Sequence, residues 1–152
     1  MIIILEQLLR TVILFVLFFF LTLISVSDIK VQKIPDLYIV IIMLLGIILN
    51  YKFITFSMAD CLKGSLSIGL FMLLCALVWD KSFGGGDIKL MMAAAFIIGF
   101  KGVWRAFSSG VIMAFPYALY VIKNKRNKRS FPVGPYLCMG IYLQIIWIVY
   151  KG

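Results

Sequence analysis

Residues 11–28 read Thr-Val-Ile-Leu-Phe-Val-Leu-Phe-Phe-Phe-Leu-Thr-Leu-Ile-Ser-Val-Ser-Asp, an uncharged apolar run that ends on an acid. A helix of about 20 apolar residues crosses the hydrocarbon core of a bilayer. The rest of the chain is similar in composition: 64% of its 152 residues are hydrophobic, whereas soluble domains are about 45–50% apolar. This composition excludes a water-soluble domain, a disordered tail and a coiled coil, and it indicates an integral membrane protein.

Six charge-free windows predict six transmembrane helices. They cover residues 11–27, 37–51, 64–79, 90–100, 106–122 and 130–150. The fourth window is too short to span alone. Extended to 88–104, it carries Lys89 and Lys101 near its ends, where long side chains can reach the interface. We therefore expect an all-α, polytopic membrane protein with about six transmembrane helices, formed by residues 1–152 as a single domain.

The distribution of basic residues predicts the topology. The formal net charge is +9, and five of the 15 basic residues lie in the run 123–129. In so apolar a chain, this run favours a loop beside anionic lipid over a nucleic-acid site. The positive-inside rule puts that loop in the cytoplasm, and the alternation of spans puts loops 28–36 and 80–89 on the same side. Nine basic residues then lie inside and six outside.

The residues available for catalysis are restricted. The chain has no histidine, and its cysteines (Cys61, Cys75 and Cys138) form no Cys-x-x-Cys pair. Histidine-based triads and histidine-ligated metals are therefore excluded, and the cysteines are interpreted as small apolar fillers. We expect no metal, no other cofactor and no nucleic-acid partner.

Two acids on the same predicted side could converge although they lie far apart in the sequence. These are Asp28, after the first span, and Asp87, before the fourth. Two converging carboxylates can hold one proton between them, so that one takes a proton from water and the other donates to a carbonyl or leaving amine. The structural alternative is that each acid caps a helix or pairs with a nearby lysine, Lys30 or Lys89. Asp36 is expected to cap the second span.

Three consecutive glycines, Gly84, Gly85 and Gly86, precede Asp87. Successive glycines cost backbone entropy and contribute no packing side chain. They indicate either a flexible turn or a surface that lets a substrate backbone approach the carboxylate closely. A phosphate-binding loop is disfavoured because no Gly-Lys-Ser/Thr follows.

At these residues the sequence resembles the prepilin peptidases, which are membrane aspartic proteases of the GxGD type. Residues 84–90, Gly-Gly-Gly-Asp-Ile-Lys-Leu, are similar to the second catalytic motif of that family. Residues 28–36, Asp-Ile-Lys-Val-Gln-Lys-Ile-Pro-Asp, resemble its first motif. Residues 131–137, Phe-Pro-Val-Gly-Pro-Tyr-Leu, resemble the Pro-Phe-Gly-Pro segment that opens its last helix, with Val133 in place of Phe.

The resemblance implies that Asp28 and Asp87 are the catalytic pair, and that type IV prepilins or related pseudopilins are the substrates. Cleavage would fall at the cytoplasmic face of the bacterial inner membrane, between a short basic leader and the hydrophobic helix behind it. Lys89 would tune the charge of Asp87 or hold substrate, unless it merely reaches the interface. The start of the last span would be shaped by three residues, Pro132, Gly134 and Pro135.

One departure from the family concerns a second activity. Bifunctional members also methylate the new amino terminus, and they carry a cytoplasmic insertion with paired Cys-x-x-Cys motifs that bind zinc. Here about eight residues join the first two predicted spans, without such a motif. We therefore expect a peptidase-only member.

Other classes of membrane protein remain alternatives. In an ion or proton transporter, Asp28 and Asp87 would lie in the translocation path. Proteases similar to presenilin or signal peptide peptidase carry Pro-Ala-Leu and Tyr-Asp motifs, which this sequence lacks. A purely structural scaffold gives no reason for the three glycines before Asp87.

Overall fold

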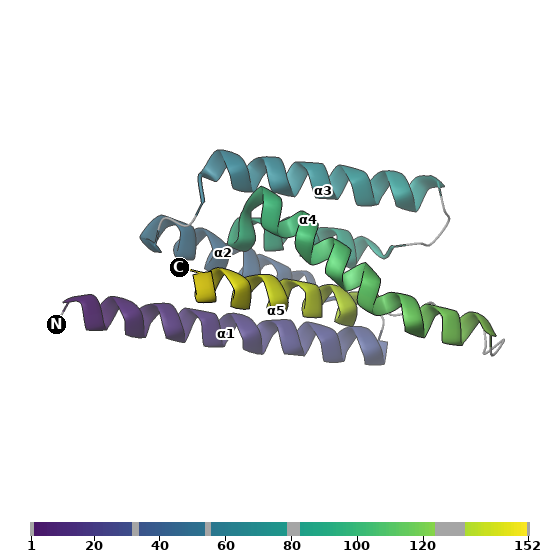
Figure 1. Ribbon diagram of the computed structural model, residues 1–152, viewed down its shortest axis with the longest axis horizontal. Helices are drawn as coiled ribbons and strands as arrows, with labels where there is room; N and C mark the ends of the chain where they lie inside the picture. Colours follow the sequence, from purple (N-terminus) through teal and green to yellow (C-terminus); the bar gives the residue numbers. More distant parts are fainter. Residues whose placement is uncertain (1, 32–33, 54–55, 79–82, 124–132, 152) are drawn as a thin grey trace.

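The protein is a bundle of helices that pack side by side (Figure 1). The computed structural model describes residues 2–31, 34–53, 56–78, 83–123 and 133–151. The helices found in these residues are α1 (Ile2–Val31), α2 (Asp36–Phe53), α3 (Met58–Val78), α4 (Gly85–Lys123) and α5 (Gly134–Lys151). Because these described ranges contain no strand, the predicted all-α fold is confirmed.

Three segments are long and apolar enough to cross a membrane. They are Ile4–Val31, Met58–Val78 and Gly85–Tyr120, and the shorter apolar helix Gly134–Tyr150 accompanies them. The 30 residues of α1 rise about 45 Å, which exceeds the ~30 Å of a hydrocarbon core. Both ends of α1 therefore reach the membrane interfaces. The chain is a polytopic membrane protein.

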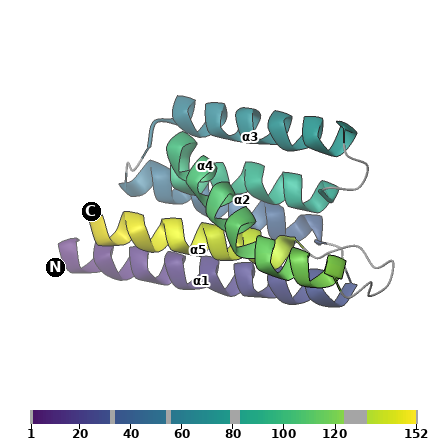
Figure 2. The ribbon, with the colours of Figure 1, turned by 45° about the vertical axis from the view of Figure 1, so that its right-hand side comes forward.

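Helix α4 is divided by a kink at Gly99. This residue has φ 68° and ψ −179°, a backbone conformation that essentially only glycine adopts. The chain turns back there, so the two segments of α4 run in opposite directions (Figures 1 and 2). Six helical segments result, which is compatible with the six predicted spans.

The sequence placed this break incorrectly. It predicted a break between residues 100 and 106, where Lys101 and Arg105 interrupt the apolar pattern, but residues 101–105 are helical. A charged residue interrupts the apolar pattern of the sequence, but it does not end the helix. The reversal requires a backbone conformation that glycine supplies, and Gly99 is the residue that adopts it.

A buried polar side chain supports the kink. Asn50 of α2 is 5% exposed and donates a hydrogen bond from Nδ2 to the carbonyl of Phe96, three residues before Gly99. An interrupted helix frees carbonyls of its preceding turn, and inside a membrane there is no water to pair with them. Asn50 therefore stabilises the interruption from a neighbouring helix.

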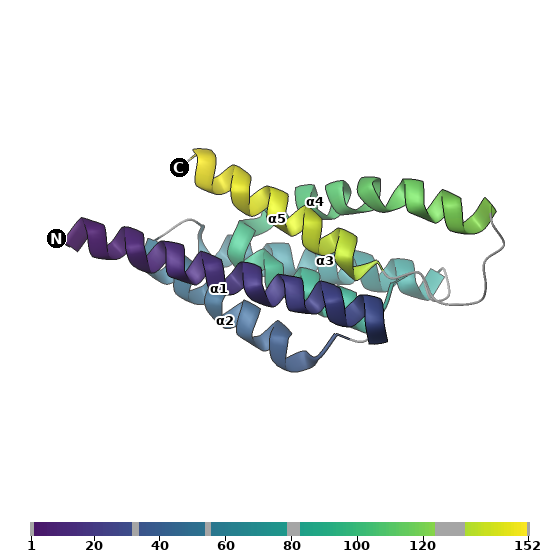
Figure 3. The ribbon, with the colours of Figure 1, turned by 90° about the horizontal axis from the view of Figure 1, so that it is seen from below.

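Successive helical segments alternate in direction, as all three views show (Figures 1, 2 and 3). The last turns of α1, α3 and α4 and the first turns of α2, α4 and α5 lie at one end of the bundle, which we name the aspartate end after Asp28 and Asp87. Both chain termini and the kink at Gly99 lie at the other end, the termini end. The helix ends that border the predicted loops 28–36, 80–89 and 123–129 lie together at the aspartate end, while residues 124–129 themselves lie outside the described residues.

Helix α4 is the centre of the bundle. In the apolar 18-residue window of its span, 61% is buried, against 28% in the window of α1 and 33% in that of α3. It packs against α2, α3 and α5, while α1 packs against α5 and α2. Small buried residues of α4, Ala93 to Ala95, allow the neighbouring helices to approach closely, as is usual between helices in membranes.

Replacing Gly99 by Ala is expected to lower the temperature of thermal unfolding. The new Cβ would strain the backbone and would lie 2.8 Å from Cδ1 of Phe56. Strain of this kind costs about 1–3 kcal/mol. Gly85→Ala is the matched control because a Cβ at Gly85 meets no atom within 4 Å. Equal unfolding temperatures for the two variants in one detergent would contradict this role of Gly99.

Candidate active site

The two acids that the sequence singled out lie together at the aspartate end. Asp28 lies in the last turn of α1 and Asp87 in the first turn of α4. Their side chains are only 6% and 7% exposed. The carboxylates are close enough to repel one another electrostatically. Two residues 59 positions apart in the chain therefore form one pair of buried acids.

The start of α5 holds Asp28 in place. The backbone N–H of Gly134, the first residue of α5, donates a hydrogen bond to Oδ2 of Asp28 at 3.1 Å. The first N–H groups of a helix have no partner inside it, and they carry partial positive charge. A Cβ at Gly134 would lie 2.6 Å from the same Oδ2. Glycine is therefore the residue that allows α5 to begin against this carboxylate.

Asp87 is held by its own helix start. Its Oδ2 accepts a hydrogen bond from the N–H of Gly84 at 3.3 Å, and its N–H donates to the carbonyl of Gly84 at 3.0 Å. This is half of a capping box, so the capping interpretation describes part of its geometry. The other oxygen, Oδ1, is buried and has no hydrogen-bond partner among the described residues. It is available to accept a hydrogen bond from a ligand.

The three glycines before Asp87 differ in their surroundings. A Cβ at Gly86 would lie 3.0 Å from Cβ of Ile34, and one at Gly84 would lie 3.4 Å from Oδ2 of Asp87. Gly85 is exposed and has nothing within 4 Å of a Cβ. Gly86 therefore allows α4 to start close to Ile34, while Gly84 has only an ordinary contact with Asp87 and Gly85 faces open space.

Lys89 pairs with Asp36. Its Nζ lies 2.8 Å from Oδ1 of Asp36, and the two side chains are 57% and 71% exposed. Asp36 begins α2, as expected of a helix cap, so the ion pair joins the starts of α2 and α4. The sequence had not linked these residues, which are 53 positions apart.

Cys138 is a neighbour of the site that the sequence interpretation missed. It is fully buried, as expected of an apolar filler, but it lies close to Ser25 and to both aspartates. It lies four residues after Gly134, on the same face of α5, and this helical spacing is the signal that could have found it. Pro135 is half-buried in the first turn of α5, and Pro132 lies outside the described residues.

The arrangement suits acid–base chemistry by carboxylates. Within the ranges that the structure describes, no group of three or more Cys, Asp or Glu side chains is placed to hold a metal ion. Two buried carboxylates that repel one another can share one proton, which leaves one of them as a base and the other as an acid.

The fold and the site thus define a class: a polytopic membrane protein with paired acids at one end of its helices. Residues 15–122 match the family model of the type IV leader peptidase family. The match contains both aspartates, the three glycines and Lys89, and it ends before Gly134. The chain belongs to the type IV leader peptidase family.

Two curated relatives agree with this family. The chain is 26% identical over 147 residues to the prepilin leader peptidase/N-methyltransferase of Escherichia coli (strain K12), with 90% of this chain and 65% of that protein aligned. It is 24% identical over 134 residues to the protein of the same name from Pseudomonas aeruginosa strain PAO1, with 81% of this chain and 45% of that protein aligned. The chain thus spans less than two thirds of the length of either relative. No solved structure matches it.

Proposed function

We propose that this chain is a membrane aspartic endopeptidase that removes the leader peptide of type IV prepilins or related pseudopilins. The single observation that carries the proposal is the pair of buried carboxylates, Asp28 and Asp87, at one end of a membrane bundle. The names of the two curated relatives supply the substrate class.

The proposed mechanism uses one proton shared by the two acids. The ionised carboxylate takes a proton from a water molecule, which attacks the scissile carbonyl. The protonated carboxyl donates its proton to the carbonyl oxygen, which gives a gem-diol. The carboxyl that took the proton from water then donates it to the leaving amine as the C–N bond breaks, and a hydroxyl proton of the gem-diol returns to the other carboxylate. The buried and unpaired Oδ1 of Asp87 supports a role in holding the water or the substrate. Because the pair titrates as a unit, neither aspartate is assigned the role of base or acid individually.

The membrane position of the pair fits a cut beside an apolar helix. Both aspartates lie within a turn of a helix end, at the aspartate end, so a substrate helix embedded in the bilayer could present its first peptide bonds there. The excess of basic residues at this end supports a cytoplasmic location in a bacterial inner membrane. A translocation path would place its acids deeper among the helices, and the position of this pair does not favour one.

Replacing Asp28 or Asp87 by Asn is expected to abolish cleavage of a co-expressed prepilin that carries a basic leader. The amide keeps the shape of the side chain but cannot exchange a proton, so a loss of roughly 10²–10⁴-fold is expected. Shortening of the prepilin is followed on gels and by mass spectrometry of the new amino terminus. We expect that terminus to be unmethylated.

The control for this experiment is Asp60→Asn, which removes an exposed carboxylate at the termini end. It is expected to cleave as well as the unaltered protein. Normal cleavage by both Asp28→Asn and Asp87→Asn would contradict the catalytic pair. Ion flux in vesicles that depends on these aspartates, without proteolysis, would support the transporter instead.

Gly134→Ala is expected to reduce cleavage strongly, because its Cβ would collide with Oδ2 of Asp28 and displace either α5 or the carboxylate. Asp60→Asn, which alters an exposed side chain at the termini end, should retain the activity. Initial rates of the two variants, normalised to folded protein in the membrane, make the comparison. Equal rates would contradict the positioning of Asp28 by α5.

The rate of cleavage is expected to fall at high pH, where both carboxylates are ionised and no acid remains to protonate the leaving amine. It is also expected to fall at low pH, where both are protonated and no base remains. Rates measured across the pH range in one detergent test this profile. A flat profile into strongly basic conditions would contradict the shared proton, and a loss on chelation that added metal restores would contradict metal-free chemistry.

A further inference from the structure

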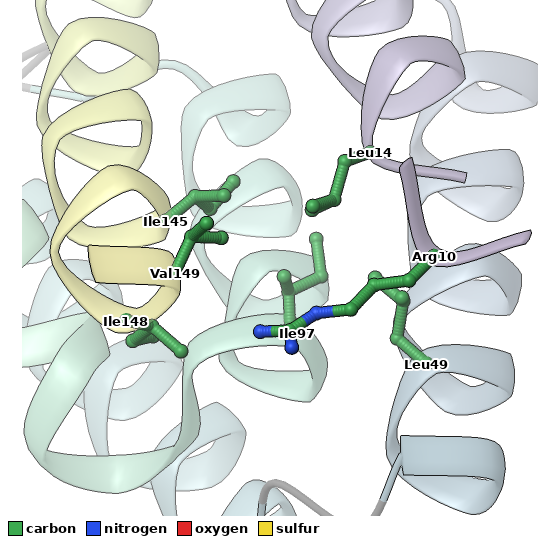
Figure 4. Close-up of a pocket in the computed structure, with 7 residues that line it drawn as sticks. All are labelled: Arg10, Leu14, Leu49, Ile97, Ile145, Ile148 and Val149. Carbon is green, nitrogen blue, oxygen red and sulfur yellow. The ribbon is translucent and has the colours of Figure 1, made fainter. Parts of the chain in front are cut away.

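The termini end of the bundle holds a crevice with a cation at its edge (Figure 4). Arg10 of α1 is half-buried, and its guanidinium points across the crevice (Figure 4). The crevice has a volume of about 30 Å³. Its other lining residues are all aliphatic and come from α1, α2, α4 and α5: Leu14, Leu49, Ile97, Ile145, Ile148 and Val149.

Arg10 has no ionic or hydrogen-bonding partner in the part of the chain that the structure describes. A guanidinium cannot be relieved of its charge by losing a proton, because arginine stays protonated in proteins. A half-buried cation beside aliphatic side chains is costly unless an anion pairs with it. The described residues supply no anion for Arg10, so an anion that pairs with it would come from outside them.

The depth of Arg10 indicates where that partner lies. Arg10 and Asp28 are on the same helix, 18 positions apart, which corresponds to about 27 Å of rise. A hydrocarbon core is about 30 Å thick. When Asp28 lies at one membrane interface, Arg10 lies at the opposite one, at the level of the lipid phosphates.

The surroundings favour an anionic lipid over a zwitterionic one. Exposed basic side chains at the same end outnumber the exposed acids, Glu6 and Asp60. The basic ones are Lys52, Lys63, Lys101 and Arg105. A guanidinium binds the oxygens of a phosphate through two parallel hydrogen bonds. The crevice accepts only a few methylene groups of a lipid chain, so the rest of that chain would lie along the outside of the bundle.

We propose that Arg10 and this crevice form a binding site for one anionic phospholipid in the leaflet opposite the aspartates. The lipid phosphate pairs with the Arg10 guanidinium, and part of an acyl chain enters the crevice. Since the lining comes from four helices, the bound lipid holds α1, α2, α4 and α5 together at the end remote from the aspartate pair.

The test is native mass spectrometry of the delipidated full chain, titrated with phosphatidylglycerol or with phosphatidylcholine of the same acyl chains. The unaltered protein is expected to retain phosphatidylglycerol at least about tenfold more tightly than Arg10→Gln does, because one charge-assisted phosphate contact is lost. Lys101→Gln is the matched control, since it removes the same charge from an exposed position at the same end that does not line the crevice. It should bind as the unaltered protein does.

Two further measurements keep the result interpretable. Arg10→Lys keeps the charge but loses the two parallel hydrogen bonds, so it should bind phosphatidylglycerol more weakly than the unaltered protein while folding alike by circular dichroism. Inorganic phosphate alone should not compete. The site is refuted if phosphatidylcholine binds equally well, if inorganic phosphate displaces the lipid, or if Arg10→Gln and Lys101→Gln lose the same affinity.

Discussion

The reversal of the chain at Gly99 determines which groups can meet at the aspartate end. Helices that cross a bilayer alternate in direction, so the number of passes between two residues decides whether they share a side. Because α4 turns back at Gly99, α5 starts at the end where α1 finishes (Figure 3). A straight α4 would put the start of α5 at the termini end, and the Gly134 N–H could not reach Asp28. One positive-φ glycine, braced by Asn50, therefore sets the geometry of a site far along the bundle.

The aspartates are held by backbone N–H groups, and this choice of partner suits a shared proton. A lysine or arginine in contact would favour the ionised form of both acids. Gly134 and Gly84 each donate one hydrogen bond instead, which fixes a carboxylate oxygen without adding a full charge. Lys89 is the nearest cation along α4, and its pairing with Asp36 directs its ammonium to another carboxylate. The buried acids are thus stabilised mainly by positioned backbone N–H groups and not by an opposite charge.

The sequence predicts those features that the bilayer itself dictates. Charges are expensive inside hydrocarbon, so charge-free windows show the helices, and alternation of the spans places Asp28 and Asp87 at one end. Packing is harder to predict. In the sequence, the break at Gly99 is marked only by a glycine. Lys101 and Arg105 instead suggest a loop, although the residues between them are helical. The Lys89–Asp36 pair and the position of Cys138 depend on the register between helices distant in sequence. The catalytic roles stay predictions.

The two ends of the bundle solve the same electrostatic problem in opposite ways. A buried carboxylate can be stabilised from within the protein, because backbone N–H groups reach it and because it can take up a proton. A half-buried guanidinium has neither kind of help, because backbone N–H groups are donors like itself and because it cannot lose its proton. Arg10 therefore needs an anion, and the described chain offers none. At the membrane interface the abundant anion is a lipid phosphate. The proposed lipid would therefore balance the charge at one end, as the proposed shared proton would at the other.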